Sequence, residues 1–224
     1  MKNAAISIHV LGPIETNCYL ITNSDTKTKE TIIVDPTKDG SLTCPIRRYC
    51  ESHGLTPVAV LLTHGHFDHF NKAEELRDYY NIPVYAGEDE VQLLSDPALN
   101  LSCMLDYSGG ESVLTPCRTV KDGQMLHLAG LEIKAISTPG HTLGGICYYF
   151  GKTGKAKALP FLMSGDTLFK GSHGRIDFPT GDYETLMQSL RHRLFILPGE
   201  TIVYPGHGET TSITAESARF TENR

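Results

Sequence analysis

Apolar and polar residues alternate along three segments near the start of the chain, at 5–11, 17–23 and 31–35. A period of two is typical of a strand with one buried face, so each segment is predicted to be a β-strand. The stretch 41–53 has the spacing of a helix, and Gly54 follows it as a helix stop. The apolar run 58–62 then predicts a further, more deeply buried strand.

The same two patterns continue to the end of the chain. The remaining predicted elements are helices at 70–80, 88–95 and 184–195, strands at 84–86 and 201–205, and a short closing helix. A strand-rich pattern is predicted at 119–136, 145–150 and 160–165. The segment 96–118 contains Pro97, Gly109, Gly110 and Pro116, and is interpreted either as a loop over a site or as a surface excursion. The basic stretch 151–157 is predicted to be a solvated hairpin tip. Two strand-rich halves, each with helices, favour a double-sheet core between helical layers.

Composition narrows the range of partners. The 224 residues are 40% hydrophobic and carry a net charge of −6, which argues against a nucleic acid held through its phosphates. No apolar run approaches the length of a membrane span, so no membrane partner is expected. The N-terminal segment resembles a strand more than a signal peptide, and the six cysteines form no CxxC pair. We therefore expect a cytoplasmic protein.

The strand 58–62 leads directly into a run of polar residues that packing alone does not explain. Thr63 is followed by His64, His66, Asp68 and His69. Buried imidazoles and carboxylates are costly unless they are paired or coordinated. Both groups are ligands of zinc and similar divalent metals. The spacing predicts that His64 and His66 share one site and that Asp68 and His69 reach a neighbouring one.

Three later segments repeat the arrangement of a strand, a small residue and a potential ligand. His141 follows the strand that ends near Ile136, Asp166 follows the apolar run 161–165, and His207 follows the strand 201–205. Glycine precedes each of these ligands, and it permits the turns or close approaches that such positions need. Each segment is weak evidence taken singly. In this order, after the first run, they predict a metal centre.

With these residues in place, the chain resembles the metallo-β-lactamase superfamily over nearly its whole length. The stretch His64 to His69 matches the HxHxDH signature, and His141, Asp166 and His207 match the later ligand positions. The resemblance implies an α+β protein with a four-layer αββα sandwich, formed by one domain over residues 1–224. It also implies that the metal site lies at one edge of the sandwich.

The resemblance implies two divalent ions, with zinc the first expectation and iron or manganese also accepted. One ion would be held by His64, His66 and His141, and the second by Asp68, His69 and His207, with Asp166 between the two. Thr63, Thr138 and Thr142 are expected to support these ligands. Asp35 matches a supporting aspartate of the superfamily, with a turn or cap residue as the alternative interpretation.

Within the superfamily, the chain is most similar to the glyoxalase II-like hydroxyacylglutathione hydrolases. Gly165 to Phe169 matches their GDTLF motif, and Gly174-Arg175 matches a glycine and a basic residue that holds glutathione. Phe169, His173 and Arg175 are therefore predicted to contact substrate, with an Arg175–Asp177 ion pair as the alternative for Arg175. Two departures favour the short, single-domain relatives. The chain ends soon after His207, so the C-terminal helical domain is expected to be missing, and Asp177 replaces a usual aromatic residue.

The expected activity is hydrolysis of a thioester or a related ester by a water that bridges the two metals. Asp68 and Asp166 are the predicted catalytic residues, with Asp68 orienting the nucleophile and passing a proton to the leaving group. The first alternative is a mononuclear iron persulfide dioxygenase, because Gly174 to Phe178 also resembles a GRxDF stretch of those enzymes. Lactone hydrolysis uses the same ligands.

Other activities are less favoured by the sequence. Antibiotic lactamases often place a cysteine at a second-metal position, where this chain has Asp166. A non-enzymatic metal-binding module would be expected to lack a ligand, and none is missing. The sequence leaves open the acyl group and thiol of the substrate, the identity of the metal and the oligomeric state.

Overall fold

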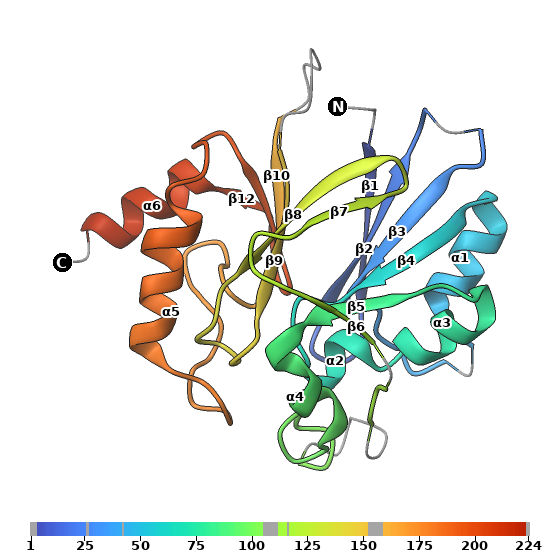
Figure 1. Ribbon diagram of the computed structural model, residues 1–224, viewed down its shortest axis with the longest axis horizontal. Helices are drawn as coiled ribbons and strands as arrows, with labels where there is room; N and C mark the ends of the chain where they lie inside the picture. The colour runs from blue at the N-terminus through green and yellow to red at the C-terminus, as the bar shows by residue number, and fades with distance from the viewer. Residues whose placement is uncertain are drawn as a thin grey trace.

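The computed structural model describes residues 4–25, 27–41, 43–104, 112–115, 117–151 and 159–222. Its strands form two six-stranded sheets, and in each sheet neighbouring strands are also consecutive in sequence (Figure 1). The first sheet contains β1 (Ala4–Leu11), β2 (Thr16–Asn23), β3 (Glu30–Val34), β4 (Thr56–Leu61), β5 (Val84–Gly87) and β6 (Arg118–Val120). The second contains β7 (Met125–Leu128), β8 (Leu131–Ser137), β9 (Ile146–Phe150), β10 (Phe161–Gly165), β11 (Ile202–Pro205) and β12 (Thr211–Ser212).

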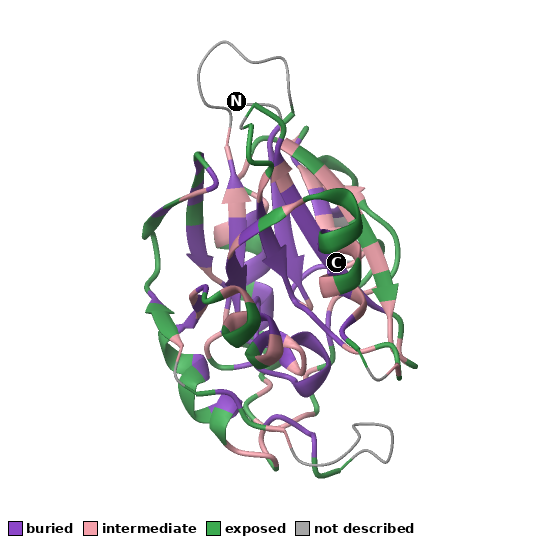
Figure 2. Cartoon of the chain, turned by 90° about the vertical axis from the view of Figure 1, so that its right-hand side faces the viewer, coloured by how far each residue is buried: buried purple, intermediate pink, exposed green. Residues whose placement is uncertain are grey.

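Helices cover the outer face of each sheet. The described helices are α1 (Pro45–His53), α2 (Phe67–Phe70), α3 (Ala73–Tyr80), α4 (Val91–Ser95), α5 (Tyr183–Ser189) and α6 (Ile213–Glu222). The first four accompany the first sheet, whereas α5 and α6 lie beside the second (Figure 1). Figure 2 shows mostly buried strands behind helices that expose one face. The predicted α+β four-layer sandwich is confirmed.

The alternation of side chains along the strands divides the apolar residues among three cores. In β2, Leu20 packs toward α1 and α3, whereas Tyr19 and Ile21 pack between the two sheets. In β10, Met163 joins the core between the sheets and Leu162 joins the core under α5 and α6. Because successive strand residues point to opposite faces, strands buried on both faces show continuous apolar runs. This pattern therefore produces three apolar cores, one between each pair of neighbouring layers in the four-layer fold.

Strand direction brings the ligand-bearing turns to one edge of the sandwich. β3 pairs with β4 in parallel, so the residues that follow both strands lie side by side. In the second sheet, β8 and β10 both pair antiparallel with β9, and β11 is parallel to β10. These three strands therefore run in the same direction. The segments that follow them, which carry His141, Asp166 and His207, emerge at the same edge.

Several predicted boundaries were wrong. The helix expected from residue 41 begins at Pro45. The helix expected at 70–80 begins only at Ala73, because the short helix α2 before it ends at Phe70. The segment 184–195 is α5 followed by a π-helical turn at Leu190–Leu194, and 88–95 opens with a 3-10 turn. The predicted tip at 151–157 lies almost wholly outside the described residues, as does the middle of 96–118. No helix among the described residues is both long enough and apolar enough to cross a membrane.

Candidate metal centre

The first potential ligands emerge from the end of β4 through a turn that is closed by tight packing. Gly65 separates His64 from His66, and a Cβ added at Gly65 would lie 2.6 Å from Leu93 Cδ2 and 2.9 Å from Glu90 Oε2. Only glycine fits there without displacing neighbours. His66 is extended, with φ −70° and ψ 143°, and α2 begins at the next residue. Asp68 and His69 therefore leave the same short helix in adjacent directions.

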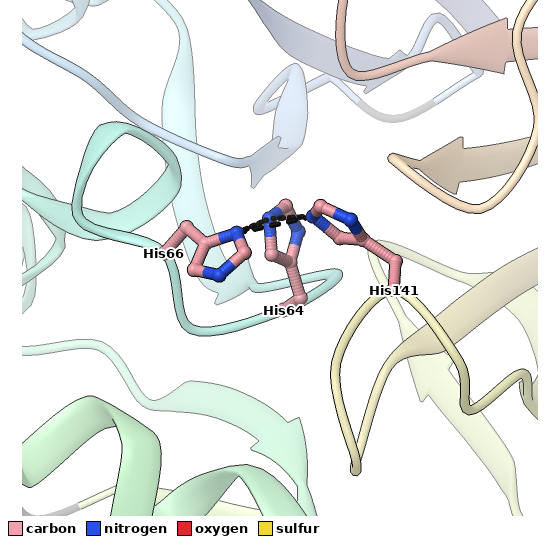
Figure 3. Close-up of side chains that lie close together, drawn as sticks. All are labelled: His64, His66 and His141. Carbon is pink, nitrogen blue, oxygen red and sulfur yellow. Dashed lines mark hydrogen bonds between the residues drawn. The ribbon is translucent and has the colours of Figure 1, made fainter. Parts of the chain in front are cut away.

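Three imidazole nitrogens meet at the first site. His64 Nε2 lies 3.1 Å from His66 Nδ1, and His141 Nε2 lies 3.3 Å and 3.0 Å from these two atoms (Figure 3). Nitrogens bound at 2.0–2.1 Å around a tetrahedral zinc would be about 3.3 Å apart. The triangle of nitrogens is therefore close to the size that a zinc-like ion requires.

The hydrogen-bond partners show which nitrogens in this triangle carry lone pairs. His141 Nδ1 lies 2.7 Å from the carbonyl oxygen of Arg175, which can only accept, so Nδ1 carries the proton. Thr63 donates its hydroxyl proton to Asp35 at 2.6 Å and can accept from His64 Nδ1 at 3.2 Å. Both Nε2 atoms are thus left unprotonated in the neutral rings. Converging lone pairs repel one another unless a cation lies between them.

A second group of potential ligands adjoins the first, and its imidazole rings are also oriented by hydrogen bonds from Nδ1. His69 Nδ1 donates to Asp35 Oδ2 at 2.9 Å, and His207 Nδ1 donates to the Ile14 carbonyl at 3.0 Å. Their Nε2 atoms face Asp68 Oδ2 at 3.2 Å and 3.4 Å. In their neutral forms the two rings each offer an Nε2 lone pair, and with the Asp68 carboxylate they form a ligand set suited to a divalent ion.

Asp166 lies between the two groups. Its Oδ2 is 3.6 Å from His141 Nε2 and 3.6 Å from His207 Nε2, so one oxygen faces both groups. Its Oδ1 is buried without a hydrogen-bond partner among the described residues, as is His69 Nε2, and these atoms are 3.5 Å apart. Buried polar atoms without partners are rare and call for an explanation. A divalent ion bound between them would satisfy both.

The electrostatics of the two groups differ. Burial lowers the pKa of His64 and His66 well below its ordinary value, and the neighbouring imidazoles add to this. Burial alone would also lower the pKa of His69, but Asp68 and the other carboxylates outweigh it and raise that pKa well above its ordinary value. For Asp68, burial favours a higher pKa, yet His69 and His207 hold it well below its usual range. The first site thus keeps neutral rings, and the second attracts positive charge.

The predicted supporting residues occupy different places. Asp35 accepts from the Thr63 backbone and hydroxyl and from His69, so it joins the two groups. Thr142 donates its hydroxyl to Glu90 at 2.5 Å. Thr138 instead hydrogen-bonds to Thr167 and Cys147, and to no predicted ligand among the described residues.

Two further residues of the centre were not predicted from the sequence. Thr16 donates to Asp68 Oδ2 at 2.8 Å. Glu90 is completely buried and accepts from the Gly65 and Gly144 backbones and from Thr142. Glu90 lies in the acidic run Glu88-Asp89-Glu90, which resembles a solvated surface. No feature of that run distinguished its last residue.

A cavity of about 320 Å³ opens over the two groups. Its lining includes the predicted substrate contacts Phe169, His173 and Arg175, together with Leu101 from the segment 96–118. The Arg175 guanidinium forms two hydrogen bonds with Asp177, at 2.9 Å and 2.6 Å, and lies 4.2 Å from the centre of the Phe178 ring. Arg175 therefore borders the cavity with its charge paired to a carboxylate.

Comparison with known proteins agrees with this architecture. The model of the metallo-beta-lactamase superfamily matches residues 11–207. A probable metallo-hydrolase of Bacillus subtilis, YqgX, is 37% identical over 207 residues, covering 92% of this chain and 91% of the relative. The hydroxyacylglutathione hydrolase GloC of Haemophilus influenzae is 32% identical over 211 residues, covering 94% of each chain. The chain belongs to the metallo-β-lactamase superfamily.

Solved structures share the fold. The BLEG-1 B3 metallo-beta-lactamase superposes with a TM-score of 0.84 at 36% identity, over 96% of this chain and 97% of that chain. The protein TTHA1623, in a di-iron-bound form, gives 0.76 at 32% identity, with 94% and 96% covered. ETHE1 from Myxococcus xanthus gives 0.73 at 26% identity, with 96% and 82% covered.

Proposed function

We propose that this protein is a dinuclear metal-dependent hydrolase that cleaves a small thioester of the hydroxyacylglutathione type. The observation that carries the proposal is the pair of adjoining ligand groups with Asp166 between them, open to a cavity of about 320 Å³. Hydrolase activity is consistent with the probable metallo-hydrolase YqgX, and the thioester class with GloC.

Two bound divalent ions, zinc in the first instance, would supply an acidified water and a positive field for the oxyanion and the leaving thiolate. The chain's own residues supply position and proton control. Thr16 and the two imidazoles around Asp68 orient its carboxylate at the floor of the cavity. Asp68 is the candidate for passing a proton to the leaving group. The apolar side chains of Leu101 and Phe169 line the cavity and exclude water from part of its wall.

The expected setting is the cytoplasm, with a small-molecule substrate and with no nucleic-acid or membrane partner. All six cysteines are free, which supports a reducing compartment. The net charge of −6 supports the absence of a phosphate-bound polymer.

The test is thiol release from S-D-lactoylglutathione by purified protein, with metal content measured on the same sample. Turnover is expected to disappear on chelation and in Asp166→Ala, and to persist in the control Asp78→Ala, which removes an exposed carboxylate on α3 that pairs with Arg77. Absence of turnover in protein that holds two ions per chain would refute the glutathione thioester. Nitrocefin serves as a counter-screen, because BLEG-1 is a metallo-beta-lactamase.

The likeness to ETHE1 and the GRxDF-like stretch favour one second candidate, a mononuclear iron persulfide dioxygenase. The supporting results would be one iron per chain and oxygen consumption with glutathione persulfide. Two ions per chain together with thioesterase turnover would exclude it. Lactone hydrolysis, the third candidate from the sequence, is assayed with the same metal-loaded protein.

A further inference from the structure

A second cavity, of about 280 Å³, lies between α5, α6 and the loop that follows β10. Its lining includes Arg191, from the π-helical turn after α5, and Arg219, from α6. His173 lines both this cavity and the one over the metal centre. The α5–α6 pocket, as we call it, is therefore separated from the metal centre by one short loop.

The two arginines of the α5–α6 pocket differ from others on the surface. Neither guanidinium forms an ion pair with a carboxylate among residues 4–220 whose side chains the structure describes. Five other arginines do have carboxylate partners: Arg47, Arg48, Arg77, Arg175 and Arg193. Glu216, one turn before Arg219, is engaged elsewhere, because its oxygens accept from the Gly171 backbone at 2.9 Å and from the Thr211 hydroxyl at 2.6 Å. The pocket thus contains two guanidinium groups that have no carboxylate partner among the described side chains up to residue 220.

The loop between the two cavities limits the distance from Arg219 to the metal centre. Gly171 packs against the Arg219 guanidinium, since an added Cβ would lie 2.7 Å from Arg219 Nη1. Gly174 packs against the metal centre, since its Cβ would lie 2.1 Å from the Asp166 carbonyl oxygen and 2.8 Å from His141 Nδ1. Three residue steps separate these glycines, so their Cα atoms are at most about 11 Å apart. A thiol of about tripeptide length spans such a distance.

We propose that the α5–α6 pocket binds an anionic group, a carboxylate or a phosphate, on the thiol half of the substrate. The proposal rests on the thioesterase function proposed above and adds the charge of its substrate. Arginine forks bind carboxylate and phosphate bidentately. Two of them also offset the repulsion that an anionic substrate meets from a chain of net charge −6 and from the carboxylates of the metal centre. Arg175, already paired with Asp177, is less available for this role.

The experiment compares wild-type protein, the double variant Arg191→Gln/Arg219→Gln and the control Arg193→Gln. Arg193 lies in the same turn but pairs with Asp122, so the control removes a nearby charge without touching the pocket. The substrates are S-D-lactoylglutathione, with carboxylates, lactoyl-coenzyme A, with phosphates, and S-lactoyl-N-acetylcysteamine, with no charge on its thiol half. Arg191 and Arg219 are exposed and Arg193 is partly exposed, and thermal melting checks that each variant is folded.

The expected result is a roughly tenfold rise in KM of the double variant for a charged thioester, equivalent to about 1.4 kcal/mol. The kcat/KM for the uncharged thioester should stay within twofold, and Arg193→Gln should resemble wild type. The effect should shrink at high salt. A larger rise in KM for S-D-lactoylglutathione would identify the bound anion as a carboxylate, and a larger rise for lactoyl-coenzyme A would identify it as a phosphate. Equal changes for all three substrates, or no change for any, would overturn the proposal.

Binding of unreactive thioethers separates this proposal from the proposed function. S-methylglutathione and S-methyl-coenzyme A are titrated calorimetrically into wild-type protein and the double variant. If no thioester is hydrolysed, thioesterase function fails, yet a tenfold weaker binding of either thioether by the double variant still supports the pocket. If neither thioether binds wild-type protein, or both proteins bind equally, the anion site is overturned whatever the activity.

Discussion

Replacing Glu90 should loosen the metal centre, because its carboxylate ties together the two loops that carry His64, His66 and His141. Glu90 Oε2 accepts from the Gly65 backbone at 2.8 Å, and Oε1 accepts from the Thr142 hydroxyl at 2.5 Å and the Gly144 backbone at 2.8 Å. Burial raises the pKa of Glu90, while these donors counteract the rise. Three donors around one carboxylate suit its ionised form.

The magnitude follows from the groups that would lose their acceptor. Glu90→Ala leaves the buried Gly65 N–H and the buried Thr142 hydroxyl without their partner, at about 1–3 kcal/mol each. The sum of about 2–6 kcal/mol is a large part of the ~5–15 kcal/mol that stabilises a typical domain. Glu90→Gln keeps one acceptor oxygen, but its NH₂ group would face one of the N–H donors. The free energy of unfolding should therefore fall by about 1–3 kcal/mol. Misplaced loops should weaken zinc binding by about 10–100-fold.

The assay is chelator-competition titration of zinc, with thermal melting of the metal-free proteins. Glu88→Gln is the matched control, because Glu88 is two residues away, carries the same charge and is exposed beside Lys121. The expected order of zinc affinity is wild type and Glu88→Gln first, then Glu90→Gln, then Glu90→Ala. Zinc affinities of both Glu90 variants within twofold of Glu88→Gln would refute the reasoning.

Three further predictions concern the same centre. Asp35→Asn should weaken the binding of one of the two ions by about 10–100-fold, because the new NH₂ group would face a hydrogen-bond donor of Thr63 or His69. Zinc titration measures this, and Asp39→Asn, at an exposed position, is the control. Gly206→Ala should lose bound metal, because its Cβ would lie 2.1 Å from Asp166 Oδ1, and full metal content after desalting would contradict this. Chelation should lower Tm by about 8–16 °C. Metal present at a thousandfold excess over its Kd stabilises the folded protein by about 4 kcal/mol, and each kcal/mol corresponds to about 2–4 °C in Tm. An unchanged Tm after metal removal would show that the centre contributes nothing to stability.

The sequence predicted the fold and the placement of the candidate ligands because both depend on local patterns. Continuous apolar runs such as 58–62 and 161–165 end abruptly at polar residues, and an apolar-to-polar change of this kind marks where a buried strand reaches the sheet edge. The structure brings His64, His66 and His141 into one group. The spacing predicted this for His64 and His66, and the resemblance to the superfamily implied it for His141. The ligand roles themselves stay predictions until metal is measured.

The parts that the sequence did not predict depend on distant contacts. The helical pattern runs without a break through Asn71 and Lys72, yet the helix is interrupted there. The Lys72 N–H donates to the Pro36 carbonyl, and the Asn71 side chain accepts from the Lys38 backbone. A contact with the segment after β3 thus overrides local propensity. Glu90 was missed for a related reason, since burial of one carboxylate in an acidic run depends on what packs against it.

The metal centre joins the two sheets, and this explains why one half of the chain could not form it alone. The first group needs His141 from the second half, and the second group needs His207. The two halves are also joined beside the ligands, where the Asn17 side chain at the start of β2 donates to the carbonyls of Pro205 and Gly208 on either side of His207. The Asn17 N–H donates to Gly206, and Thr16, which holds Asp68, bridges to His207. The position of a ligand from the second sheet is therefore set by a strand of the first. Metal binding and the packing of the two sheets should consequently stabilise each other, because each orders the same few residues.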